Sequence, residues 1–175
     1  MKKQGITVPS LILITSIAIL GVSFIYTVWT QSEMRARDTR RINDFAIIRQ
    51  AMELYFHDYN DYPVVSGGKP ISSKDTEWGS FSSQLSSYLE GVPHDPINNA
   101  SGPWIQGNYS YTYIYGEKDS NGVRLYDLIT QLEDTKNPRI CAERNWKIHT
   151  ADDVSWCGTD TPEPYIANGM LYSDH

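Results

Sequence analysis

Residues 6–29 of the chain, ITVPSLILITSIAILGVSFIYTVW, form a continuous segment without any charged side chain. At 1.5 Å per residue a helix of this length measures about 36 Å, enough to cross a hydrocarbon core of about 30 Å with some tilt. The run continues without Gly or Pro into a charged segment that keeps helical spacing as far as His57. A secretory signal would have a shorter apolar stretch, followed by a cleavage site and a separate domain. We therefore predict one helix from about Ile6 to His57, whose first half spans a membrane.

The second half of this helix, residues 31–58, divides into two parts. Apolar residues recur at steps of three and four in its later part, which predicts a stripe that packs on a folded domain. The stripe consists of Ile42, Phe45, Ile48, Met52, Tyr55 and Phe56. From Gln31 to Arg41, charges of both signs leave no apolar stripe. We expect that part to be solvated or to touch another chain.

The segment 59–132 predicts a small antiparallel sheet with one short helix. Phe81, Leu85, Tyr88 and Leu89 have helical spacing before Gly91 and Pro93. Tyrosines alternate strictly from 109 to 115, which is typical of a strand, and 123–132 is the expected hairpin partner. The tyrosine face could form an exposed adhesive ladder, but a face packed on a helix is favoured. Segment 133–175 has little periodicity and predicts loops with at most one further strand. The predicted fold class is α+β.

Composition sets limits on function. The chain has 175 residues, so about 145 remain outside the span, the size of one domain. A net charge of −6 and a pI near 5.1 give no basic footprint for nucleic acid. The two cysteines, Cys141 and Cys157, lack zinc-site spacing and predict a disulfide in an oxidising compartment.

The five residues before the span, Met1 to Gly5, have two interpretations. Lys2 and Lys3 could retain a simple signal-anchor in the membrane, or residues 1–5 could be a leader that is cut after Gly5. Pro9 favours cleavage or a helix that begins at Ile6, because proline is tolerated in the first helical turn and costs ~3 kcal/mol in the interior.

An ordered set of residues resembles the type IV pilins and the pseudopilins of type II secretion systems. The set follows the leader and the span, and it covers roughly residues 1–133. It comprises Arg37-Asp38-Thr39-Arg40-Arg41-Ile42-Asn43-Asp44, Ala51-Met52-Glu53-Leu54-Tyr55, Asp58, Asn60, Tyr62-Pro63, Leu85, Tyr88-Leu89, Pro93, Asp95-Pro96 and a tyrosine-rich hairpin that ends at Leu132-Glu133.

The resemblance implies a pilin-like lollipop: a long helix whose second half packs on an antiparallel head, and whose first half (6–30) forms a filament core. It also implies that a prepilin peptidase cuts between Gly5 and Ile6 and methylates the new N-terminus. The implied partners are other copies or related pilins, a membrane assembly platform, and the bilayer before assembly. The subunit would be single-pass in the cytoplasmic membrane with its head outside, and later part of an extracellular filament.

One position departs from the family pattern. The fifth mature residue, usually glutamate in the family, is Ser10 here. The resemblance then implies a minor or tip subunit, or a lineage that neutralises the N-terminus differently. Hydroxyl residues and Gly21 along the span suit close helix packing.

The charges that flank the span conflict with an external head. Arg35, Arg37, Arg40 and Arg41 follow the span, against Lys2 and Lys3 before it, so the positive-inside rule favours a cytoplasmic domain. The interleaved acidic residues, the cysteine pair and the family resemblance favour the opposite orientation, which we adopt.

No catalytic or metal-binding motif was identified, so we expect a structural protein and not an enzyme. His94-Asp95 beside a serine is interpreted as a polar loop. Residues 117–122 begin like a calcium loop but lack its twelfth-position carboxylate, so a hairpin turn is favoured there. The resemblance to pseudopilins, some of which bind calcium in loops after the sheet, implies Asp152, Asp153 and Asp160 as calcium candidates. The expected function is therefore a pilus-like filament subunit. The alternatives are a secretion pseudopilin and a single-pass anchored extracellular domain that binds a ligand without polymerising.

Overall fold

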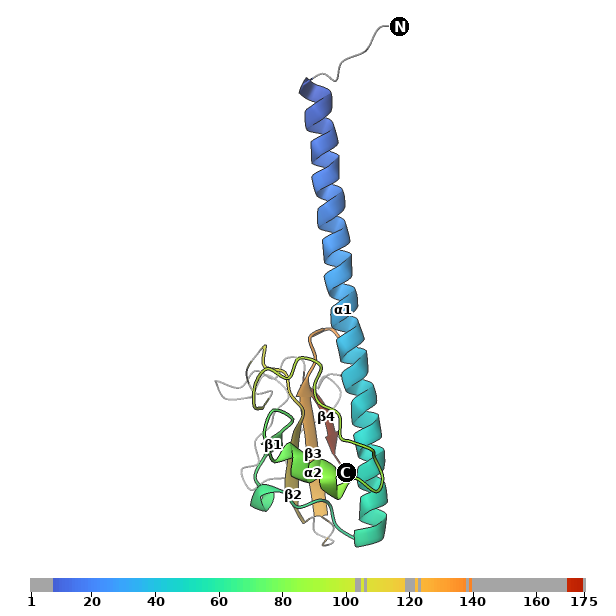
Figure 1. Ribbon diagram of the computed structural model, residues 1–175, viewed down its shortest axis with the longest axis vertical. Coiled ribbons are helices and arrows are strands. Elements are labelled where there is room, and N and C mark those ends of the chain that lie inside the picture. Colours follow the sequence, from blue (N-terminus) through green and yellow to red (C-terminus); the bar gives the residue numbers. More distant parts are fainter. Residues whose placement is uncertain are drawn as a thin grey trace. The chain divides into compact units, whose positions relative to one another are not determined.

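The computed structural model describes residues 8–102, 105, 107–118, 122, 124–137, 139 and 170–174. It contains the long apolar helix and a small antiparallel sheet, so the α+β class is confirmed (Figure 1). The chain forms two compact units, Met1–Ala36 and Arg37–His175.

Helix α1 runs from Val8 to Tyr59 without interruption through both units. Its 52 residues correspond to about 78 Å. Pro9 lies in the first described turn, where backbone N–H groups have no helical partner and proline is tolerated. The C-terminal end is two residues beyond the prediction, and Asn60 follows with a positive φ of 52°.

The sheet of the second unit has four antiparallel strands in the order β1-β2-β3-β4. These are β1 (Ile71–Ser72), β2 (Thr112–Lys118), β3 (Arg124–Gln131) and β4 (Met170–Asp174). The predicted hairpin is confirmed, since Tyr113 of β2 pairs with Leu128 of β3. Tyr109 and Tyr111 precede the strand because their N–H groups bond to loop side chains, Asn99 and Ser73 respectively.

Two short helical elements complete the described fold. The 3-10 turn η1 spans Ser66–Gly68, and α2 spans Trp78–Gln84. Helix α2 begins three residues before the predicted position and ends earlier, because Leu85 leaves helical geometry at ψ 2°. The chain then continues in turns in which Tyr88 and Leu89 both donate to the Leu85 carbonyl.

Tyrosines in and just before β2 pack on both helices, which confirms the packed face favoured from the alternation. The Tyr111 ring meets Phe45 of α1 edge-on at 5.3 Å between centroids, and the Tyr113 ring stacks on Phe81 of α2 at 4.4 Å. These contacts belong to one apolar core in the second unit. Its buried members are Phe45, Ile48, Ala51, Met52, Tyr62, Val65, Ile71, Trp78, Phe81, Leu85, Val92, Tyr111, Tyr113, Tyr126, Leu128 and Leu132.

Candidate functional site

The first half of α1 presents apolar side chains to its surroundings on all sides. None of its most apolar 18-residue window is buried, and by length and composition the helix could cross a membrane. Exposed large apolar residues follow one another from Val8 to Trp29, over about 33 Å of helix. Because a helix that is apolar all round is stable only when lipid or protein surrounds it, this surface is the candidate functional site.

Five hydroxyl groups in this half, those of Thr15, Ser16, Ser23, Thr27 and Thr30, are satisfied by the helix backbone itself. Ser16 and Ser23 donate to the carbonyls four residues earlier, each at 2.8 Å. Thr15, Thr27 and Thr30 donate to carbonyls three residues earlier, at 2.8–3.1 Å. An unpaired hydroxyl in hydrocarbon would cost several kcal/mol, so these internal bonds make the helix compatible with lipid. The small hydroxyl side chains still lie among large apolar ones along the helix surface.

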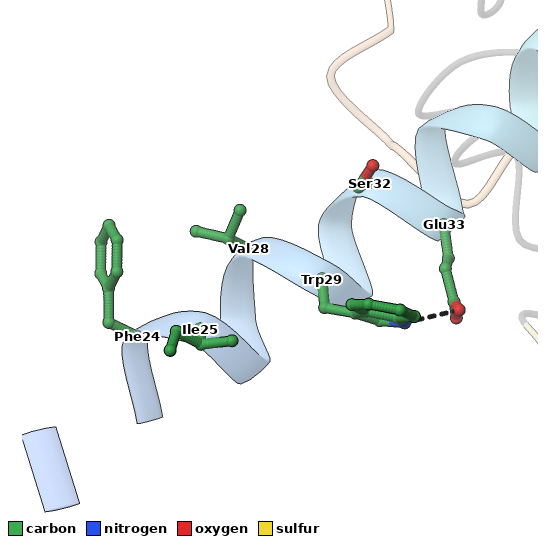
Figure 2. A pocket seen from close by; sticks show the side chains of 6 residues that line it. All are labelled: Phe24, Ile25, Val28, Trp29, Ser32 and Glu33. Carbon is green, nitrogen blue, oxygen red and sulfur yellow. Dashed lines mark hydrogen bonds between the residues drawn. The ribbon is translucent and has the colours of Figure 1, made fainter. Parts of the chain in front are cut away.

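The C-terminal end of the apolar run is marked by Trp29 and Glu33. The indole Nε1 of Trp29 donates to Glu33 Oε1 at 2.6 Å, which lays the ring along the helix, as Figure 2 shows. Beside it is an open hollow whose apolar wall comes from Phe24, Ile25 and Val28 and whose polar end comes from Ser32 and Glu33. A tryptophan with its ring in apolar surroundings and its N–H on a carboxylate is typical of a membrane–water boundary.

A buried group of charged residues lies in the second unit where α1 enters it. We call Arg37, Asp38, Arg41, Asp95 and Glu133 the ionic cluster. The Arg41 guanidinium donates to both Asp95 carboxylate oxygens, at 2.7 and 3.0 Å, and to Asp38 and Glu133, each at 2.8 Å. Arg37 forms a two-pronged pair with Glu133 at 2.8 and 2.7 Å. The side chain of Arg41 has no exposed surface.

Backbone groups and one ring complete the cluster. Asp38 accepts the backbone N–H groups of Glu133 and Asp134, each at 2.9 Å, immediately after β3 ends. Asp95 accepts the N–H of Ile97 at 2.8 Å. The Arg41 guanidinium carbon lies 4.7 Å from the centroid of the Tyr109 ring. These donors offset the excess of three carboxylates over two guanidinium groups.

The electrostatics of the cluster favour its ionised form. Burial alone disfavours the charged guanidinium of Arg41, but its hydrogen bonds and charge interaction with Asp95, and then its bonds to Glu133 and Asp38, raise its pKa above the ordinary value. Burial likewise acts to raise the pKa of Glu133, yet the bonds from Arg37 and Arg41 outweigh it and lower that pKa.

The expectation that residues 31–41 have no partner within the chain is wrong for Arg37, Asp38 and Arg41. Asp38 and Arg41 are buried, and all three bond to residues 54–96 positions away. The periodicity of apolar residues cannot reveal this contact, because the residues that make it are charged. Their partners also follow much later in the sequence. The clue in the sequence was the coincidence of Arg41 with the apolar stripe, four residues before Phe45.

The other predicted site residues divide into described and undescribed ones. Pro9, Ser10 and Gly21 all lie in the exposed half of α1, and a Cβ built on Gly21 meets nothing within 4 Å. The cleavage pair Gly5 and Ile6, the cysteines Cys141 and Cys157, and the calcium candidates Asp152, Asp153 and Asp160 lie outside the described residues. Within the described ranges, no cluster of three or more metal-binding side chains occurs.

His94 and Asp95 point to different partners. His94 Nδ1 lies 2.8 Å from the Ser73 carbonyl oxygen, while the Asp95 carboxylate holds Arg41. Their interpretation as a polar loop, and not as part of a catalytic triad, is consistent with these contacts.

Comparisons with protein-family models, with curated proteins and with solved structures found no match.

Proposed function

We propose that this chain is a structural subunit of a type IV pilus-like filament, with the pilin-like architecture that the sequence resemblance implies. The observation that carries the proposal is the uninterrupted helix α1, whose N-terminal half is exposed and apolar while its C-terminal half contributes Phe45, Ile48 and Met52 to a core. One helix thus carries both an exposed apolar surface and side chains that belong to a folded core.

The exposed half would be surrounded by lipid before assembly and by the helices of neighbouring copies afterwards. Five of its hydroxyl groups already bond to the helix backbone, so leaving lipid for a protein bundle breaks none of those bonds. Small and hydroxyl residues let helix backbones approach closely, which favours helix–helix contact over an all-leucine surface. The internal hydrogen bonds and the small residues on the helix surface are therefore compatible with both the bilayer and a bundle of neighbouring helices.

The proposal includes the processing that the resemblance implies. Prepilin peptidase cuts between Gly5 and Ile6 and methylates the new N-terminus, and an assembly platform then transfers the subunit from the cytoplasmic membrane into the filament. The folded unit lies on the outer side of the membrane. With Ser10 at the fifth mature position, a minor or tip subunit remains an alternative within this proposal, and so does a secretion pseudopilin.

The mature N-terminus tests the proposal. Mass spectrometry of the chain from its native cells should show Ile6 as the first residue, with the added mass of one methyl group. Gly5→Glu should block processing and leave the whole chain in the membrane fraction. Gln4→Glu is the matched control, since it places the same charge one residue away from the cleavage pair and should be processed.

Two results would contradict the proposal. Gly5→Glu subunits that enter filaments normally would exclude cleavage as the assembly step. An intact Met1, or a cut near residue 30, would favour the single-pass anchored domain that does not polymerise. Antibody labelling of sheared surface filaments then separates a main subunit, labelled along the fibre, from a tip subunit, labelled at one end.

A further inference from the structure

The part of α1 that enters the second unit is held by charges and not by an apolar core. The first two buried side chains of the helix are Asp38 and Arg41, and the fully apolar buried series starts only at Phe45. Ile42, which lies between Arg41 and Phe45, is only partly buried. The turns from Arg37 to Asp44 therefore depend on polar contacts for their attachment to the sheet.

These contacts join three segments that are distant in the sequence. Arg41 connects α1 to the Asp95 turn, and Thr130 of β3 donates to the same Asp95 carboxylate at 3.3 Å. Asp38 connects α1 to the chain just after β3 through two backbone N–H groups. Separating the helix from the sheet at this end requires several charge-assisted bonds to break together, because each guanidinium or carboxylate is shared between segments.

We propose that the ionic cluster is a latch that sets the rate at which α1 separates from the sheet. Buried ion pairs contribute little net equilibrium stability compared with apolar residues of the same size, because desolvation offsets their attraction. Pulling the charges apart nevertheless raises the free-energy barrier to unfolding, because the charges lose each other before water fully solvates them. The latch closes late in folding because its geometry needs three segments in place at once, and the two that bind Asp38 and Arg41 of α1 lie 54–96 residues further along the chain.

A late-forming contact has a specific kinetic signature. Interactions that are absent from the folding transition state slow unfolding without speeding folding. The latch therefore holds the helix in the unit against transient opening, a property that would matter for a helix that is drawn out of a bilayer. The inference concerns the folded unit, and its test does not require a filament.

The test compares unfolding and refolding rates of the full-length chain in detergent micelles after urea jumps, followed by tyrosine and tryptophan fluorescence. The variant Arg41→Met/Asp95→Asn removes one charge of each sign, while the asparagine oxygen can still accept the Ile97 N–H. We expect it to unfold at least about tenfold faster and to refold within about twofold of the wild-type rate.

Arg40→Met is the matched control. Arg40 is adjacent, 60% of its side chain is exposed, and it lies 3.6 Å from Asp44, so both of its rates should stay within about twofold of wild type. An unfolding rate of the double variant that equals the wild-type rate would overturn the latch proposal. Slower refolding with unchanged unfolding would also overturn it, because it would place the cluster in the transition state as an ordinary folding contact.

A milder variant keeps the test decisive if the double variant does not fold. Arg41→Lys retains the charge but replaces the planar fork by a single ammonium, which cannot reproduce the two-pronged contact with Asp95. It should unfold several-fold faster than wild type. An unchanged unfolding rate in this variant would contradict the proposal.

Discussion

Tyr113 is a tyrosine of the sheet that also stabilises a loop. Its side chain is buried, and its hydroxyl donates to the Pro63 carbonyl oxygen at 2.8 Å, directly after α1 ends. Tyr113→Phe leaves that buried carbonyl without this donor, so we expect the free energy of unfolding to fall by about 1–2 kcal/mol in urea titrations. Tyr115→Phe is the control. Its hydroxyl reaches the partly exposed Asp61 at 3.0 Å, so the loss should be smaller.

Glu133 gives a pH dependence whose sign follows from its surroundings. Its pKa is lower in the folded chain than its ordinary value near 4.5, because bonds from Arg37 and Arg41 outweigh the effect of burial. Its contribution is therefore complete above that ordinary value and is lost as the pH falls through it towards the lower folded pKa. At neutral pH, Glu133→Gln should reduce the free energy of unfolding by about 1.5–3 kcal/mol.

The difference between wild type and Glu133→Gln should shrink as urea titrations move from pH 6 to pH 3. The two proteins differ only at position 133, so a change in their difference with pH reports on the Glu133 carboxylate. A difference that stays constant over this range would show that the Glu133 pKa is not lowered by folding.

At the scale of elements, α1 has two faces in the second unit whose roles can be separated. Phe45 is 4% exposed and contacts Tyr111, whereas Ile47 is 45% exposed. Phe45→Ala should lower the free energy of unfolding by about 3–5 kcal/mol, and Ile47→Ala by less than about 1 kcal/mol. Equal losses in urea titrations would mean that the outer face is also packed.

The elements that could be predicted are those with a repeating apolar pattern. The long helix, the tyrosine strand and its hairpin partner follow from periodicity alone. Strand β1 has only Ile71 and Ser72, too short for any pattern, and α2 is shifted because serines make its helical signal weak. The ionic cluster was missed because it depends on Asp95 and Glu133 coming to α1, which only the folded chain reveals.

At the scale of the whole molecule, the buried apolar core and the exposed apolar surface occupy separate parts of the chain. In the part of the chain that the structure describes, every buried apolar core residue lies at Phe45 or later, and the long exposed apolar series ends at Trp29. A chain that begins at Gln31 should therefore fold and remain monomeric without detergent, whereas the full-length chain should require it. Gel filtration and circular dichroism check this. Aggregation of the shortened chain, or non-cooperative unfolding, would show that the second unit depends on the apolar half.

The hydrogen bonds that the N–H groups of Glu133 and Asp134 donate to Asp38 also bear on biosynthesis. Glu133 and Asp134 follow Asp38 by 95 and 96 residues. At about 5–20 residues per second, the ribosome therefore makes them roughly 5–20 s after Asp38. During that interval Arg41 and Asp38 stay hydrated and the nascent chain cannot complete its folded unit. If the apolar N-terminal segment enters a membrane, it can therefore do so before the second unit folds, because the order of synthesis separates the two events.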